Sequence, residues 1–226
     1  MAQPRSDISL LVDGSALYLA SRQVDAARTL DYRALENSLR QRVGARTFEP
    51  AVLWTSFDAT NEGQAKFLEF IERELRWTVD AVPVQDAVAH PKGTATEPTS
   101  IRFGERIAYA IGRLAASGNS SIVVVSDQYS LSAPMIDVVK RGGQVWLSFF
   151  GSQLEVRYHR LIRSLPPDPK PDYSRLLSQP DAASLEQQKG RLRFIDLDDM
   201  ASEIWGSGRR ASPNGPDSGR GFARIP

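Results

Sequence analysis

The chain of 226 residues contains no cysteine and only two histidines, His90 and His159. Without cysteine it forms no disulfide, uses no thiolate nucleophile and builds no cysteine-ligated zinc site. A catalytic metal would have to take most of its ligands from carboxylates, which suit hard ions such as Mg²⁺ or Mn²⁺. Any metal cofactor that we expect here is therefore Mg²⁺ or Mn²⁺.

The sequence also lacks a long apolar run. The longest, at 8–12 and 122–125, have the length of a β-strand, far short of the roughly 20 residues that span a bilayer. Asp7 and Asp13 interrupt the region where a signal peptide would have its apolar segment. We therefore expect a cytoplasmic protein with no membrane partner.

The chain lacks a large net charge, because its 28 basic and 27 acidic residues leave a formal charge of only +1. The molecule as a whole has no field that would attract nucleic acid, so any basic surface must be local. Only five of the basic residues are lysine. The excess of arginine suits phosphate recognition by planar guanidinium groups, although a GC-rich genome is the simpler explanation.

The chain does contain a regular alternation of strand and helix patterns. Short apolar runs predict strands at 8–12, 50–57, 77–84, 121–126 and 144–150, with a final edge strand at 191–197. Helical spacing of apolar residues predicts helices at 17–24, 31–40, 61–76, 101–117, 135–141 and 154–163. This order predicts a three-layer α/β/α fold around a mainly parallel sheet of five or six strands.

One domain is expected over residues 1–205. Four prolines between 166 and 171 interrupt regular structure, so we expect a proline-rich insertion at about 164–190. From 206 to 226 the chain is rich in Gly, Ser, Pro and Arg and has few apolar residues. This composition predicts a disordered tail.

Acidic residues follow four of the predicted strands: Asp13, Asp58, Asp86 and Asp127. Ligands of parallel sheets bind beyond the carboxyl ends of the strands, and carboxylates there could hold a divalent cation that activates water. Aspartate is also a common turn and capping residue, which is the alternative explanation. No glycine-rich phosphate-binding motif follows a strand, which argues against dinucleotide and P-loop chemistry.

The segment ISLLVDGSALY, from Ile8 to Tyr18, resembles the opening of NYN domains, a branch of the PIN-like metal-dependent ribonucleases. In that family an apolar strand leads into D-G-S/x-N-L-Y. The similarity continues in order over about residues 7–200 and implies a PIN-like fold, ribonuclease ancestry and RNA as the partner. The further matching segments are Asp31–Leu35, Gln64–Leu68, Val123–Ser126, Gly142–Leu147 and Phe194–Asp198.

The resemblance also implies an acidic site for one or two Mg²⁺ ions. Its first carboxylate matches Asp13, but the asparagine expected three residues later is Ala16. The family's S-G-D-x-D-F turn falls on 126–131, where Gln128 and Ser130 replace the two acids. The acids of the preceding helix fall on Gly104 and Ala110. The site is therefore expected to be degenerate, with Ser15, Ser126, Gln128 and Ser130 at its edge.

Two carboxylates, Glu105 and Asp127, each lie one position from an expected acid. In the alternative reading they join Asp13, the catalytic residue, as ligands of Mg²⁺ or Mn²⁺. A shift of one residue keeps a turn carboxylate near the site, but on a helix it rotates the side chain by about 100°.

Arginines recur in two segments that could contact RNA. Arg102 and Arg106 lie one turn apart on the helix predicted at 101–117, and Arg157, Arg160 and Arg163 recur every three residues after the fifth strand. A solvated helix face with ordinary ion pairs is the alternative explanation.

Together these observations predict an RNA-directed protein of ribonuclease ancestry with an eroded metal site and weak or no cleavage. One alternative is an active endoribonuclease that uses Asp13 with Asp127 and Glu105. Another is a non-catalytic protein-interaction module, with a protein partner or a second copy of the chain, because fold does not fix function.

Overall fold

The computed structural model describes residues 8–83, 103–118, 121–154 and 191–209. Its main sheet consists of β1 (Ile8–Asp13), β3 (Phe48–Phe57), β4 (Thr78–Pro83), β5 (Ser121–Val125), β6 (Gln144–Phe149) and β7 (Leu192–Asp196). These strands lie in the order β4-β3-β1-β5-β6-β7, and all neighbours are parallel. The predicted α/β/α fold with a mainly parallel sheet is confirmed, and β7 is the expected edge strand.

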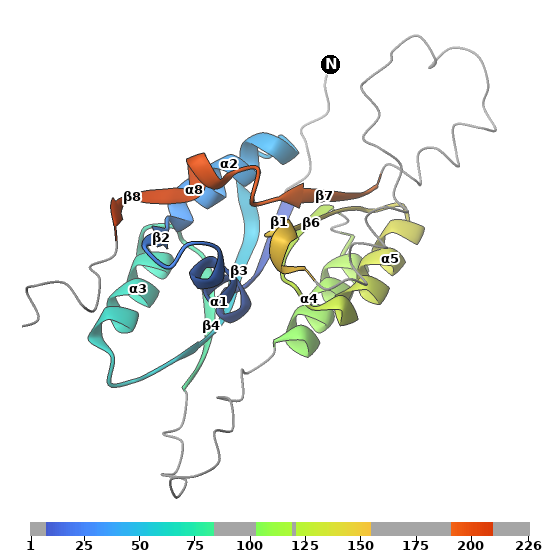
Figure 1. The fold of residues 1–226 in the computed structure, drawn as a ribbon. Helices are drawn as coiled ribbons and strands as arrows, with labels where there is room; N and C mark the ends of the chain where they lie inside the picture. Colours follow the sequence, from blue (N-terminus) through green and yellow to red (C-terminus); the bar gives the residue numbers. More distant parts are fainter. Residues whose placement is uncertain (1–7, 84–102, 119–120, 155–190, 210–226) are drawn as a thin grey trace, which may run out of the picture.

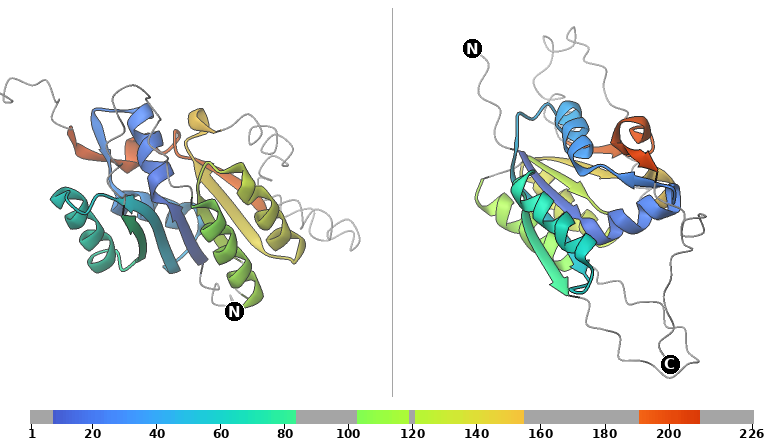
Figure 2. Two further views of the ribbon diagram at one scale, coloured as in Figure 1. Left: turned by 90° about the horizontal axis from the view of Figure 1, so that it is seen from below. Right: turned by 90° about the vertical axis from the view of Figure 1, so that its left-hand side faces the viewer.

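Helices cover both sides of this sheet (Figure 1). On one side lie α1 (Gly14–Val24), α2 (Tyr32–Val43) and α3 (Glu62–Arg73), and on the other α4 (Gly104–Ala116) and α5 (Ser132–Lys140). The left view of Figure 2 shows α4 and α5 side by side. The central strands β1 and β5 are almost entirely buried, as their continuous apolar runs predict for a sheet covered on both faces.

Three helices begin at a polar side chain that accepts backbone N–H groups of the first turn. Asp13 accepts from Ala16 at the start of α1, Asp31 accepts from two residues at the start of α2, and Asn61 accepts from Gln64 at the start of α3. Asp31 is also the first residue of the helix predicted at 31–40. The cap at Asp13 explains why α1 begins directly after β1, three residues earlier than the apolar spacing predicted.

A second, two-stranded sheet was not predicted. β2 (Arg28–Leu30) pairs in antiparallel fashion with β8 (Trp205–Arg209), which follows the short helix α8 (Ala201–Ile204). The backbone N–H of Asp31 also donates to the Ile204 carbonyl at 2.8 Å. Residues 206–209, which were predicted to belong to the disordered tail, form part of β8 instead.

Several expectations fall on residues outside the described ranges. They are the proline-rich insertion at about 164–190, the helix at 154–163 and the tail beyond 209. Within the described ranges, no helix is both long and apolar enough to cross a membrane.

Candidate functional site

A pocket of about 170 Å³ lies at the carboxyl edge of the main sheet. Four of the residues that the sequence placed at the site line it together: Asp13, Ser15, Asp127 and Gln128. Asp13 ends β1, Ser15 lies in the first turn of α1, and the other two follow β5. We call this the Asp13 pocket. Its position is the one that the strand-end rule for parallel sheets predicts.

The Asp13 side chain is 1% exposed, and both of its carboxylate oxygens accept hydrogen bonds. Oδ1 accepts from the Ala16 backbone N–H at 3.0 Å, and Oδ2 accepts from the Gln128 side-chain amide at 2.6 Å. A buried carboxylate is tolerated only when such donors replace water. The pKa of the Tyr32 hydroxyl is raised, mainly because Tyr32 is buried. The nearby negative charge of Asp13 is the second cause.

The loop after β5 holds Gln128 in place. Its backbone N–H donates to the Oγ of the fully buried Ser126 at 3.2 Å, and its carbonyl accepts from Leu131 at 3.0 Å. The side-chain amide lies over Gly104 at the start of α4, where a Cβ would overlap Gln128 Oε1 and lie 3.3 Å from Ser130 Oγ. Positions 104, 128 and 130, where the resemblance implies acids, are therefore adjacent in space, and none carries one.

Ser15 connects α1 to the end of β3. Its Oγ accepts from the Ser56 backbone N–H at 3.0 Å and lies 3.0 Å from Ser56 Oγ. These bonds give the hydroxyl a structural role at the edge of the pocket.

The structure does not bring the three predicted metal ligands to one pocket. Asp13 and Asp127 line the Asp13 pocket, whereas the exposed Glu105 lines a separate groove along α4. Among the described residues no group of three acidic or histidine side chains is arranged to hold a metal ion. These side chains are poor ligands for Mg²⁺, because the Gln128 amide already donates a hydrogen bond to Asp13. Positions 104, 128 and 130 also carry no carboxylate that could bind the ion.

Asp58 is a turn residue. Its carboxylate accepts from the Thr60 hydroxyl at 2.7 Å and from the Thr60 backbone N–H at 2.8 Å. These two hydrogen bonds lower the pKa of the Asp58 carboxyl group. The fourth strand-end acid, Asp86, lies outside the described residues.

Two glutamines that the sequence analysis did not single out also line the pocket, Gln23 from α1 and Gln153. Gln153 ends the short 3₁₀ helix at Gly151–Gln153 after β6. Asp196 on β7 positions this turn by accepting from the Gly151 N–H at 2.9 Å. The strand-end rule could have found Gln153, because it closely follows a predicted strand. With Gln128, the pocket presents three side-chain amides beside two carboxylates.

Of the arginines predicted to contact RNA, only Arg106 lies in the described residues. Its guanidinium donates to Asp80 on β4 at 2.7 Å, and both side chains are partly exposed. Arg102, Arg157, Arg160 and Arg163 lie outside the described ranges.

No protein-family model matches the chain, and no curated protein matches it. Among solved structures, the chain is similar to a protein of unknown function from Vibrio parahaemolyticus. That comparison has a TM-score of 0.56 at 14% sequence identity and covers 91% of this chain and 100% of the other. At this identity the similarity concerns the fold alone, and it agrees with the three-layer architecture.

Proposed function

We propose that this chain is an NYN-type, PIN-like protein of ribonuclease ancestry that is directed to RNA and has weak or no cleavage activity. The observation that carries the proposal is the 2.6 Å hydrogen bond from the Gln128 amide to Asp13 Oδ2. In a metal-dependent nuclease that oxygen would face a cation. Here an N–H donor of the chain itself takes this role.

Ligand charge strengthens this argument. The affinity of a site for a divalent ion depends strongly on how many carboxylates it contains. Positions 104, 128 and 130 together contribute a glycine, an amide and a hydroxyl. A cation at Asp13 would have to displace the Gln128 amide and would gain no second carboxylate from these positions.

The lining of the Asp13 pocket supports RNA as the partner. Sequence-specific RNA recognition uses hydrogen bonds to the edges of unstacked bases. Besides the bonded pair of Asp13 and Gln128, the amides of Gln23 and Gln153 and the carboxylate of Asp127 supply donors and acceptors for such an edge. The volume of about 170 Å³ is close to that of an engineered cavity of about 150 Å³ that binds benzene. The pocket is thus large enough for one base ring.

The test is a binding and cleavage assay on labelled single-stranded and hairpin RNA in Mg²⁺ and in Mn²⁺, with wild type and Asp13→Asn purified identically. We expect wild type to bind RNA and neither protein to cut it efficiently. Efficient cleavage by wild type that is lost in Asp13→Asn would favour the active ribonuclease.

A second measurement addresses the predicted ligand Asp127. We expect calorimetry to give equally weak Mn²⁺ binding for wild type and for Asp127→Asn. A clear loss of Mn²⁺ affinity in the variant would assign Asp127 as a ligand and contradict the eroded site. If the wild-type protein binds no RNA at all, the proposed RNA-directed function is wrong and the protein-interaction module is the remaining alternative.

A further inference from the structure

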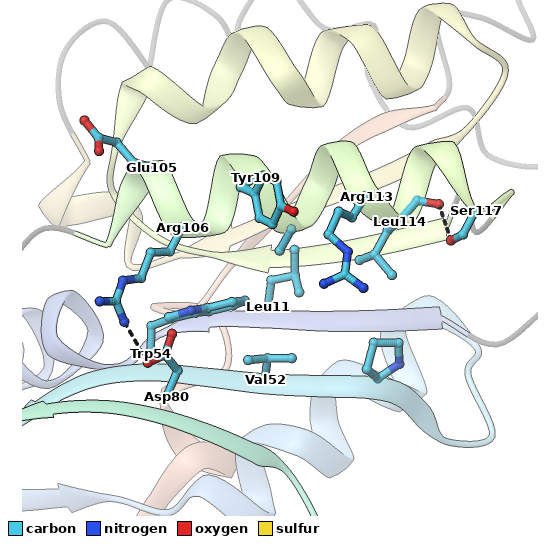
Figure 3. A pocket seen from close by; sticks show the side chains of 12 residues that line it. Leu11, Val52, Trp54, Asp80, Glu105, Arg106, Tyr109, Arg113, Leu114 and Ser117 are labelled. Atoms are coloured by element: carbon cyan, nitrogen blue, oxygen red, sulfur yellow. Dashed lines mark hydrogen bonds and ion pairs between the residues drawn. The ribbon is translucent and has the colours of Figure 1, made fainter.

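A second, larger cavity of about 690 Å³ runs along α4, on the face of the sheet formed by β1, β3 and β4 (Figure 3). Its apolar floor consists of Leu11 on β1 and of Val52 and Trp54 on the neighbouring strand β3, and α4 forms its wall. Cavities of about 300 to 1,000 Å³ with mainly apolar linings are typical of ligand sites. We call this cavity the α4 trough.

The charges of the trough differ between its two ends. At the carboxyl edge of the sheet, Arg106 forms its ion pair with Asp80, so its charge is largely compensated. Toward the other end of α4, Arg113 lines the trough and forms no ion pair with any described residue. Its guanidinium extends toward the strands in Figure 3. Of the two arginines that line the trough, Arg113 is therefore the one without an ion pair to the described part of the chain, and it lies beside an apolar floor.

An exposed aromatic ring lies next to this cation. Tyr109 is 70% exposed and lines the trough one helical turn before Arg113. Residues four apart on a helix share one face, so the ring and the guanidinium act on the same stretch of the cavity. Exposed aromatic rings stack on unpaired bases, and arginine binds the phosphates between them.

We propose that the α4 trough binds single-stranded RNA, with one base stacked on Tyr109 above the apolar floor and a neighbouring phosphate paired with Arg113. This inference rests on the proposed function and names the surface that the RNA occupies beyond the Asp13 pocket. Glu105 and Asp80 lie at the carboxyl edge, so the phosphate is expected at the Arg113 end of the trough.

Two features favour a nucleic-acid strand over a small molecule. The 13 residues of α4 rise about 20 Å along the trough, which leaves room for several nucleotides. The trough and the Asp13 pocket share no lining residue but lie near one another, because Trp54 pairs with Asp13 in the β1–β3 register and Gly104, beneath Gln128, directly precedes Glu105. A strand lying along α4 could therefore place a base in that pocket.

The experiment measures the affinity of the full chain for a labelled oligouridylate by fluorescence anisotropy over a series of salt concentrations. Arg113→Gln should weaken binding about tenfold at low salt and reduce the slope of log K against log salt by about 0.7. Tyr109→Ala should weaken binding about tenfold with little change in that slope. The matched controls are Arg73→Gln on α3 and Tyr18→Ala on α1, both exposed and outside the trough, and they should bind like wild type.

Crosslinking supplies an independent readout. RNA that carries 4-thiouridine should crosslink to the tryptic peptide Ile107–Arg113, which contains Tyr109. If wild type binds the oligouridylate but both trough variants equal their controls, or crosslinks form only outside α4 and β3, the trough is not the RNA surface. UMP that competes as strongly as the oligomer would overturn the strand as occupant. A wild type that binds no RNA overturns the proposed function as well.

Discussion

The Asp13 pocket and the α4 trough differ in how their charged side chains are paired. In the pocket, the buried carboxylate of Asp13 accepts hydrogen bonds from the chain's own amides. In the trough, the guanidinium of Arg113 forms no ion pair with the described residues. A buried charge without partners is strongly destabilising, whereas a solvated one costs little. The pocket's charge thus contributes to stability, and the trough's charge remains available to a ligand.

The largest effect is expected when this internal compensation is removed. Asp13→Ala should lower the free energy of unfolding by about 3 kcal/mol, because it removes a helix cap and leaves the Gln128 amide without its buried acceptor. The measurement is urea denaturation. Asp31→Ala removes an exposed cap of similar geometry from α2 and should cost only about 1 kcal/mol. Equal losses in the two variants would mean that the Gln128 bond adds nothing.

The second largest effect is expected when carboxylates are introduced around Asp13, so that the pocket binds a divalent cation. Gly104→Asp requires a shorter side chain at 128, since a Cβ at 104 would overlap the Gln128 amide. We therefore combine Gly104→Asp, Gln128→Asp and Ser130→Asp, so that four carboxylates surround one point. Mn²⁺ at 100 times its Kd should stabilise this variant by about 2.7 kcal/mol and leave wild type unchanged.

Thermal unfolding with and without Mn²⁺ measures this gain. Mg²⁺ and Ca²⁺ are tested in parallel to show whether the new site selects among hard cations. If none of the three ions changes the melting temperature of the triple variant, the three substituted positions do not converge on Asp13.

Two glycines of α4 test the close approach of Gln128 directly. Gly112→Ala has open space around its Cβ and should stabilise the protein by up to about 1 kcal/mol, because alanine favours the helix. Gly104→Ala displaces the amide from Asp13 and should instead cost about 1 kcal/mol. Urea denaturation of both variants gives the comparison. If both substitutions stabilise, Gln128 moves aside without losing its bond.

The smallest effect concerns Glu36, a half-buried carboxylate that accepts from the Trp77 indole N–H at 3.3 Å. Burial raises its pKa, and the Trp77 bond offsets this only in part. A raised folded-state pKa adds stability that is complete below the unfolded pKa and disappears as pH rises through the folded value.

Glu36→Gln removes this dependence and keeps an acceptor for Trp77. Between about pH 4 and pH 7, the urea midpoint of wild type should therefore fall relative to that of Glu36→Gln. Parallel pH profiles of the two proteins would show that Glu36 has the same pKa in both states.

The sequence predicted the main sheet because its strands are continuous apolar runs between amphipathic helices, and it predicted the edge at which Asp13 lies. The contact between Gln128 and Asp13 could not be predicted. It depends on the missing Cβ of Gly104, which belongs to a third segment. The α4 trough was also missed, since periodicity does not show how far a helix covers a sheet. β2 and β8 were not predicted, because each is short and polar and forms its strand by pairing with the other.

The pairing of β2 with β8 has a consequence for how the protein is made. Leu30 pairs with Trp205, so a strand synthesised early finds its partner only after almost the whole main sheet has left the ribosome. Contacts between such distant segments form slowly, because the entropy cost of closing a long loop comes before the favourable energy of the contacts. The corner where α2 begins is therefore expected to be completed last, and until then the nascent chain exposes the unpaired edge of β2 to chaperones or to other chains.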